Sequence, residues 1–473
     1  MSLSAHFKPS TRHRTLGDDF YDKVRAAEFP QTRIRYRNQA WAERLGLGSL
    51  DDAEWVAHFG RFEPLPGSLP QPLALRYHGH QFGTYNPDLG DGRGFLFAQL
   101  HDPVDGRLLD LGTKGSGRTP WSRSGDGRLT LNGGIREVLA TAMLEAQGVY
   151  TSKSFSLIET GEDLERGDEP SPTRSAVLVR LSHSHIRIGS FQRLLYLDAP
   201  HDIARLLDYA IETYWPDAWR DTVAERAAAF LACVAGAVAR VGAQWMTAGF
   251  VHGVLNTDNI NITGESFDYG PWRFVPTYDP GLTAAYFDHS GRYAYGRQPS
   301  VLAWNVTRLA ECLLPLCPQA DLEIVLDGFA PAFRVAFRDE TLRRLGVRAS
   351  TIERDDALTN AFWGFLDHSR APFEQAFFDL YGASRDLERR RRSSCAALYE
   401  SASFEPLNKA LSDAQPRDDL KLDHPYWGHP APCTLVHEAV EPILAAVAFN
   451  DWTSLEAKLA EITTMAQAYG TAL

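Results

Sequence analysis

The stretch VHGVLNTDNINI, residues 251–262, sets the expected fold of the chain. His252 and Asn259 stand at the spacing of a His-x-Asp-x-x-x-x-Asn loop, which phosphotransferases use to present a catalytic Asp and a metal-binding Asn. Val254 occupies the position of that Asp, and Asp258 stands directly before Asn259. The stretch therefore indicates a nucleotide-handling loop whose proton acceptor has moved to Asp258, although NTDN would also make a good turn.

Asp268, in the segment FDYGP, follows Asp258 by ten residues. In kinase folds an Asp-Phe-Gly turn follows the catalytic loop, and its Asp binds the metal ions that bridge the phosphates. Asn259 and Asp268 would supply the oxygen ligands that Mg²⁺ or Mn²⁺ prefers. We therefore expect these two residues to hold a divalent cation, with Asp258 as the proton acceptor.

A glycine-rich turn, LGDGRG at 89–94, leads into the strand-like run FLFAQL. Glycines let backbone N–H groups approach phosphates closely, and a guanidinium adds a charge-assisted donor. Gly90, Gly92 and Arg93 are therefore candidate nucleotide-binding residues, although most turns of this kind are ordinary hairpins.

Lys114 ends a second strand-like run, and Glu137 lies 23 residues further on in GIREVLATAMLEAQG, 134–148. Apolar residues of that segment recur at helical spacing, which predicts an amphipathic helix. Kinases hold a phosphate-binding lysine in place with a helix glutamate, so we expect Lys114 and Glu137 to pair. The loop SGRTPWSRSGDGR, 116–128, is rich in arginine and glycine and is typical of a polyanion cradle.

Two arginines of RLSHSHIRIGSF, 180–191, are candidate phosphate partners. Arg180 leaves a predicted strand, and Arg187 follows after His183 and His185. Guanidinium groups suit bidentate phosphate recognition. Two histidines without a nearby carboxylate or cysteine more often form ordinary hydrogen bonds than bind metal.

The order of these parts predicts an α+β, bilobal, protein-kinase-like fold with a mixed N-lobe and a mainly helical C-lobe. Residues 1–70 are expected to form an N-terminal extension, 71–198 the nucleotide-binding N-lobe, and 199–473 the helical C-lobe with the catalytic and metal-binding loops and a C-terminal extension. The apolar segment 227–246 contains Arg240 and repeats at helical spacing, so we expect a buried core helix and not a membrane span.

The composition of the chain argues against some classes of partner. The chain has 473 residues and a net charge of -12, which argues against a chain-wide nucleic-acid or membrane surface. The five cysteines include no Cys-x-x-Cys pair, and the N-terminus has no apolar core of a signal peptide. We expect a cytoplasmic protein with neither nucleic acid nor membrane as a partner.

Taken together, HGVLNTDN, FDYGP, LGDGRG, LGTKGSGRTPWSRSGDG, SHIRIGSF and SGRYAYGRQP resemble the selenoprotein O family, most specifically between residues 70 and 310. Members are kinase-fold proteins formerly classed as pseudokinases. The resemblance implies that ATP lies reversed in the cleft and that AMP is transferred to hydroxyl side chains of target proteins. Uridylyl transfer from UTP with Mn²⁺ is a near variant.

The resemblance also implies roles for individual residues. Asp258 would be the base, Asn259 and Asp268 the Mg²⁺ or Mn²⁺ ligands, and Glu137 the support of Lys114. The implied nucleotide-binding residues are Gly90, Gly92, Arg93, Lys114, Asp126, Gly127, Arg180 and Arg187. Family members commonly carry a selenocysteine or cysteine near the C-terminus, whereas the segment AQAYGTAL has none, so we do not expect that redox switch here.

Two other functions are compatible with the sequence. Conventional phosphotransferases similar to aminoglycoside kinases place an Asp where this chain has Val254, and losing a positioned base costs a factor of roughly 10² to 10⁴ in rate. Phosphoryl transfer depends more on positioning and charge than on the base, so Val254 weakens this alternative and does not exclude it. A non-catalytic nucleotide-binding scaffold would not require Lys114, Asp258, Asn259 and Asp268 to be present together, and all four are present.

Overall fold

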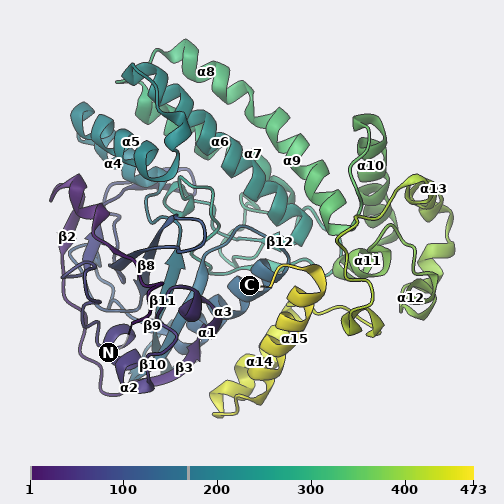
Figure 1. Cartoon of the computed structure of the whole chain (residues 1–473), viewed down its shortest axis with the longest axis horizontal. Coiled ribbons are helices and arrows are strands. Elements are labelled where there is room, and N and C mark those ends of the chain that lie inside the picture. Colours follow the sequence, from purple (N-terminus) through teal and green to yellow (C-terminus); the bar gives the residue numbers. More distant parts are fainter. Residues whose placement is uncertain (1–2, 168–170, 473) are drawn as a thin grey trace.

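The computed structural model describes residues 3–167 and 171–472 and has two lobes (Figure 1). One lobe is built around a β-sheet, drawn in purple and blue, and the other consists mainly of helices. This arrangement confirms the predicted α+β, bilobal, kinase-like fold. The division of the chain at residues 70 and 198 stays a proposal.

The main sheet has nine antiparallel strands in the order β2-β4-β7-β8-β11-β10-β3, with β1 paired to β7 and β9 paired to β11. The two strand-like runs expected before Lys114 form a hairpin around Asp105-Gly106, in which Leu100 of β7 faces Leu109 of β8. The strands are β1 (Pro9–Ser10), β2 (Tyr21–Lys23), β3 (Arg33–Arg37), β4 (Leu73–Leu75), β7 (Leu96–His101), β8 (Leu108–Lys114), β9 (Leu129–Thr130), β10 (Lys153–Leu164) and β11 (Thr173–Ser182).

The segment expected to be an N-terminal extension, residues 1–70, contributes strands to the main sheet. It supplies β1, β2 and β3, and β3 forms an edge of the sheet by pairing with β10. The strand RIRYR carries three arginines, which hid its strand character because a half-exposed edge strand needs few apolar residues. Helices α1 (Gln39–Arg44) and α2 (Asp52–Phe59) follow it.

The two faces of the sheet bury different cores because successive strand residues point to opposite sides. On β11, Ala176 and Leu178 join the core under α3 (Leu131–Ala146), whereas Val177 and Val179 join the core that contains Trp55 of α2. The predicted amphipathic helix is confirmed as α3, which begins at the cap Thr130. Glu137 is thereby fixed against the sheet.

The helical lobe is organised around the long helix α6 (Val223–Ala248), which packs against α5 (Pro200–Tyr214), α7 (Gln298–Leu313), α8 (Gln319–Asp327) and α9 (Phe329–Arg344). It is long and apolar enough to cross a membrane by length and composition, yet most of its apolar window is buried inside the protein. α6 is therefore the expected core helix.

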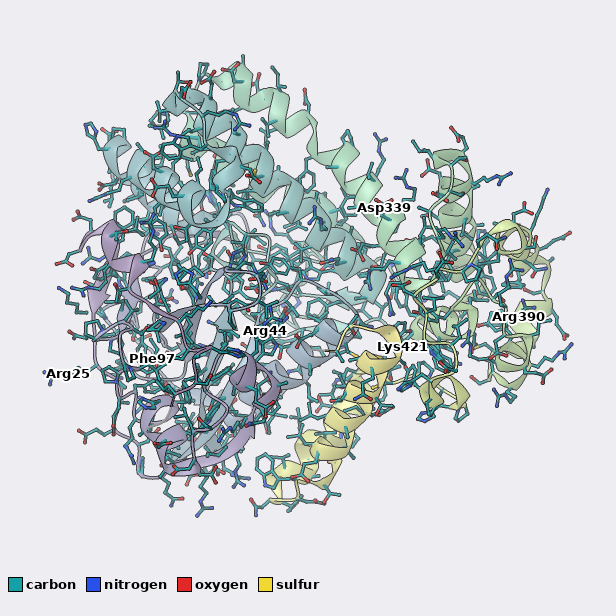
Figure 2. The ribbon with its side chains drawn as sticks, viewed as in Figure 1. Arg25, Arg44, Phe97, Asp339, Arg390 and Lys421 are labelled. Atoms are coloured by element: carbon teal, nitrogen blue, oxygen red, sulfur yellow. The ribbon has the colours of Figure 1, made fainter. Side chains whose placement is uncertain are left out.

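The remaining helices lie beside α5, at the end of the helical lobe away from the sheet, and next to α3 (Figure 1). Figure 2 shows Phe97 within the sheet lobe and Arg390 at the far end of the molecule, on α12. α15, drawn in yellow, packs against α3. These helices are α4 (Ile188–Tyr196), α10 (Ile352–Ser369), α11 (Phe373–Leu380), α12 (Leu387–Arg392), α13 (Glu405–Asp413), α14 (His437–Ala448) and α15 (Thr453–Tyr469).

The loops between the lobes carry two short hairpins. β5 (Gly79–Gln81) pairs with β6 (Thr84–Asn86), and β12 (Phe250–Val251) pairs with β13 (Arg273–Phe274). The second hairpin brackets the 252–270 segment, in which Thr257–Asn259 forms one turn of 3-10 helix.

Glu265 gives a pH-dependent test of this fold. Burial raises the pKa of its carboxyl from the ordinary 4.5 to about 7, although its Oε2 accepts a hydrogen bond from the backbone N–H of His183. The folded protein therefore holds a proton that the unfolded chain releases, and stability is lost as pH rises from 4.5 to 7.

We expect Glu265→Gln to raise the free energy of unfolding at pH 8 by up to about 3 kcal/mol, with little gain at pH 5, where the wild-type carboxyl is already neutral. Thermal unfolding at the two pH values measures this difference. An equal gain at both values, or a loss at pH 8, would contradict the assignment.

Candidate active site

Lys114 lies at the centre of an ion cluster between the lobes. Its Nζ is 2.5 Å from Oε1 of Glu137 on α3 and 2.9 Å from Oδ1 of Asp268 in the FDYGP turn. Arg180, on the neighbouring strand β11, donates from Nη1 to the same Asp268 oxygen at 3.1 Å. Four residues expected from the sequence are thus in direct contact.

Asp268 is held in an unusual backbone conformation. Its φ is +63°, in the left-handed region that residues other than glycine rarely adopt, and such strain is typical of functional sites. Burial alone would raise the pKa of its carboxyl, but attraction by Lys114 and the neighbouring arginines holds that pKa well below the ordinary value. Asp268 is therefore an anion, which is the form in which a carboxyl group binds a divalent cation.

Asn259 and Asp258 share the 3-10 turn Thr257–Asn259. The Asn259 Nδ2 donates to the carbonyl oxygen of Val254 at 3.0 Å, which orients the amide and directs Oδ1 away from that carbonyl. Val254 thus keeps a structural role through its backbone, while its side chain offers no base.

The carboxyl group of Asp258 is buried next to Gly79. Burial raises the pKa of its carboxyl to about 7, against the opposing attraction of Arg187. Its Oδ1 is buried and has no hydrogen-bond partner among the described residues. A Cβ at Gly79 would lie 2.9 Å from that oxygen, so glycine is needed to leave room beside it. The carboxyl therefore presents an unused acceptor.

Arg187 joins the turn Thr257–Asn259, called the catalytic turn below, to the N-lobe. Its Nη1 donates to the backbone oxygen of Asp258 at 3.1 Å, and its Nη2 lies 3.4 Å from Oδ1 of Asp91. The guanidinium also stacks on the ring of Tyr77, with Cζ 4.2 Å from the ring centroid. Such packing fixes a cation next to the proposed base.

A cavity of about 620 Å³, called the nucleotide cavity below, opens beside Asp258. Its size is within the usual range for small-molecule sites. The other predicted site residues do not line it and lie deeper, in the contacts described above: Lys114, Arg180, Arg187, Asn259 and Asp268. The cavity contains Asp258 and five of the nucleotide-binding candidates, and it also exposes Tyr77 and Gln81. Those five candidates are Gly90, Gly92, Arg93, Asp126 and Gly127.

Close backbone packing explains two of these glycines. A Cβ at Gly90 would lie 2.4 Å from the Trp121 ring, and one at Gly92 would lie 2.8 Å from the Trp121 carbonyl oxygen. The 89–94 turn therefore lies directly on the 116–128 loop. Asp126 orients that loop by accepting the backbone N–H of Arg128 and pairing with Arg166 at 2.8 Å.

His252 connects the two catalytic segments. Its ring Nε2 is 2.9 Å from the carbonyl oxygen of Phe267, and its backbone N–H donates to Gln298. The imidazole is fully buried. The His of the opening motif therefore positions the residue that precedes Asp268.

The residues fit a divalent cation bound partly by phosphates. Within the described part of the chain, no cluster of three or more His, Cys, Asp or Glu could hold a metal without help. Mg²⁺ is usually bound through one or two protein oxygens together with substrate phosphates. An ionised Asp268 and an oriented Asn259 amide match that donor set.

Sequence reasoning missed Tyr77, Gly79 and Asp91. Asp91 is the central residue of the LGDGRG turn, and its Oδ2 accepts the backbone N–H of Leu75 at 3.0 Å. Its position beside a glycine pair was visible in the sequence, but its partner Arg187 is 96 residues away. Gly79 and Tyr77 belong to a segment without a motif.

Comparison with known proteins shows matches along almost the whole chain. The family model described as protein adenylyltransferase SelO matches residues 2–463. A protein nucleotidyltransferase YdiU from Trichormus variabilis is 48% identical over 380 residues, covering 80% of this chain and 76% of the relative. One from Gloeobacter violaceus is 45% identical over 448 residues, covering 92% and 91%.

Among solved structures, ROP2 from Toxoplasma gondii, described as a virulence factor with a protein-kinase fold, is 12% identical. It covers 72% of this chain and 82% of its own, with a TM-score of 0.25. A score this low adds no support, and the fold assignment rests on the lobes and the ion cluster.

Replacing Asp268 by asparagine tests the ion cluster. Asparagine tolerates left-handed backbone, so the change removes charge and leaves Lys114 and Arg180 with less compensation. We expect Asp268→Asn to lower the free energy of unfolding by about 2 kcal/mol without ligand, less than for a fully buried pair. Denaturant unfolding measures it. Asp418→Asn is the control, since that side chain is 84% exposed, and equal effects of the two variants would contradict the cluster's role.

Proposed function

Because the chain belongs to the SelO family of protein adenylyltransferases, we propose that it transfers the AMP part of ATP to hydroxyl side chains of other proteins. The nucleotidyltransferase relatives, 45 to 50% identical over most of the chain, support this activity. The observation that carries the proposal is the unused, buried acceptor of Asp258 at the wall of the nucleotide cavity.

In the proposed reaction, the acceptor hydroxyl oxygen attacks the α-phosphorus. A new oxygen–phosphorus bond forms, the bond from the α-phosphorus to the bridging oxygen breaks, and pyrophosphate leaves. The hydroxyl proton passes to Oδ1 of Asp258, whose raised pKa suits a proton acceptor near neutral pH. A serine, threonine or tyrosine could supply the hydroxyl.

The cations of the cleft support a reversed orientation of ATP. Lys114, Arg180 and Arg187 are all buried at the inner side of the site, where a polyphosphate can replace Asp268 or Asp91 as their partner. A triphosphate directed inward leaves the α-phosphate toward Asp258. Arg93 and the 116–128 loop would then face the outer part of the nucleotide.

Asn259 and Asp268 would hold Mg²⁺ or Mn²⁺, which supplies charge neutralisation of the phosphates when bound. The same residues could serve UTP as well as ATP, because they recognise phosphates and not the base. We also propose that the protein acts in the cytoplasm on protein acceptors, which the five free cysteine thiols support.

Phosphoryl transfer is the second candidate, and one experiment separates the two. We expect label from [α-³²P]ATP, and none from [γ-³²P]ATP, to appear on a protein acceptor in the presence of Mg²⁺ or Mn²⁺. Label from the γ-position alone would establish a kinase instead. Absence of both labels with retained ATP binding would indicate a scaffold.

Two substitutions separate the base from the metal ligand. Asp258→Asn should lower kcat by roughly 10² to 10⁴, with nearly unchanged ATP affinity, because only the proton acceptor is lost. Asp268→Ala should abolish metal-dependent transfer. Steady-state kinetics and ATP titration measure these effects. Full activity of Asp268→Ala would refute the metal assignment.

Gly79→Ala tests the space beside the base. The added methyl would lie 2.9 Å from Oδ1 of Asp258 and should displace the carboxyl or block the acceptor hydroxyl. We expect at least a tenfold loss of kcat with ATP binding retained. The control is Gly236→Ala on α6, where a Cβ would meet no atom within 4 Å. Similar activities of both variants would contradict the proposed position of the hydroxyl.

A further inference from the structure

A second cavity lies at the turn of the β5–β6 hairpin. It has a volume of about 580 Å³, and its walls include Phe82, Ser290, Arg292, Arg297, Ser300 and Trp304. We call it the arginine cavity. Nothing in the proposed transfer reaction uses it.

The β5–β6 hairpin contributes one residue to the wall of each cavity. Gln81 lines the nucleotide cavity together with Asp258, and the next residue, Phe82, lines the arginine cavity. Phe82 and Gly83 form its two-residue turn, and both have positive φ, +50° and +84°. Such a tight turn has little freedom, so the spacing between the cavities is fixed.

Hydrogen bonds tie the hairpin turn to the catalytic turn. The Phe82 backbone N–H donates to Oδ1 of Asn256 and to the hydroxyl oxygen of Tyr293, each at 3.1 Å. The Tyr293 hydroxyl in turn donates to Asn256 at 2.6 Å. Asn256 stands two residues before Asp258, so the arginine cavity is held next to the proposed base.

The arginine cavity is lined by two guanidinium groups, with one carboxylate nearby, so its charge is positive. Arg292 and Arg297 form no ion pair among the described residues, in a chain whose net charge is -12. The nearby carboxylate of Asp288 is occupied by the backbone N–H groups of Arg292 and Tyr293. The charge of the nearby Arg308 is neutralised by its ion pair with Glu311 at 2.7 Å.

The two arginines are also held in position. The Arg292 guanidinium packs on the Gly83 turn and lies 5.1 Å from the Trp304 ring centroid, and its Nε is buried without a hydrogen-bond partner among the described residues. Arg297 is exposed and donates to the Ser290 carbonyl oxygen at 3.3 Å. Fixed guanidinium groups recognise carboxylates well because little side-chain entropy is lost.

Aromatic rings form an exposed rim beside these cations. Phe82 contacts Phe287, with ring centroids 5.8 Å apart, and Phe287 contacts Tyr286 at 5.1 Å. All three are exposed, and Tyr286 reaches 73%. Exposed aromatics next to arginines are the composition of a protein-binding surface.

We propose that the arginine cavity binds an aspartate or glutamate side chain of the acceptor protein, close to the hydroxyl that receives AMP. The inference rests on the proposed function and adds a substrate class to it. Neighbouring residues Gln81 and Phe82 line the two cavities, so the acidic residue should stand within a few positions of the acceptor in an extended peptide. An acceptor protein with acidic residues near its acceptor hydroxyl should then receive AMP more efficiently.

Acceptor peptides with serine, threonine or tyrosine provide the test. Each series carries glutamate at one position within four residues of the acceptor, and a matched series carries glutamine there. We expect the best glutamate peptide to show at least a fivefold higher kcat/KM, mainly through KM, and the advantage to shrink at high salt. Equal kcat/KM values at every position would overturn the inference.

Arg297→Gln removes one exposed cation outside the catalytic machinery. This variant should lose most of the preference for glutamate and keep its rate on glutamine peptides. Arg334→Gln, an exposed arginine on α9, is the matched control and should keep the full preference. Arg297→Glu should instead favour peptides with lysine at the same position. Equal loss of preference in Arg297→Gln and Arg334→Gln would overturn the inference.

Binding without transfer separates this inference from the proposed function. Fluorescein-labelled peptides whose acceptor is replaced by alanine should bind more tightly with glutamate than with glutamine, by anisotropy. If no peptide accepts AMP while this difference persists and depends on Arg297, the proposed function fails and the arginine cavity stands. If AMP is transferred but glutamate and glutamine peptides do not differ in binding or in kcat/KM, the proposed function stands and the arginine cavity is not a binding site for acidic side chains.

Discussion

The site depends on one buried cation, Lys114, which binds two carboxylates from distant parts of the chain. Glu137 comes from a helix of the N-lobe and Asp268 from a turn of the helical lobe. A buried charge without partners is strongly unfavourable, so each contact is required for the other elements to pack as they do. Through this lysine the sheet, helix α3 and the FDYGP turn are fixed relative to one another before any ligand arrives.

The cations around Asp268 also explain how the protein can bind a polyphosphate without large rearrangement. Lys114 and Arg180 already share one oxygen of Asp268, and Arg187 already faces Asp91. In the proposed binding mode a triphosphate would replace these carboxylates as the partner of the cations, and Asp268 would be free to bind a metal ion. Binding would then be an exchange of counterions within an existing cluster.

Much of this arrangement could be predicted from the sequence, because motifs with fixed spacing report local backbone. Lys114 at a strand end, Glu137 on an amphipathic helix and the Asp258-Asn259 turn follow from short segments. The strand RIRYR could not be predicted in this way, because its role arises from pairing with β10. The role of Gly79 could not be predicted either, because it arises from contact with Asp258, 179 residues away. Long-range contacts of residues outside motifs leave no local signal.

Helix α15 has a consequence for the time at which the site is completed during protein synthesis. It packs on α3, and the Thr471 hydroxyl donates to the carbonyl oxygen of Ala146, where α3 ends. A ribosome makes the sheet and α3 long before it reaches residues 453–469, and folding proceeds behind it. The helix that carries Glu137 therefore gains its last packing partner only late in translation.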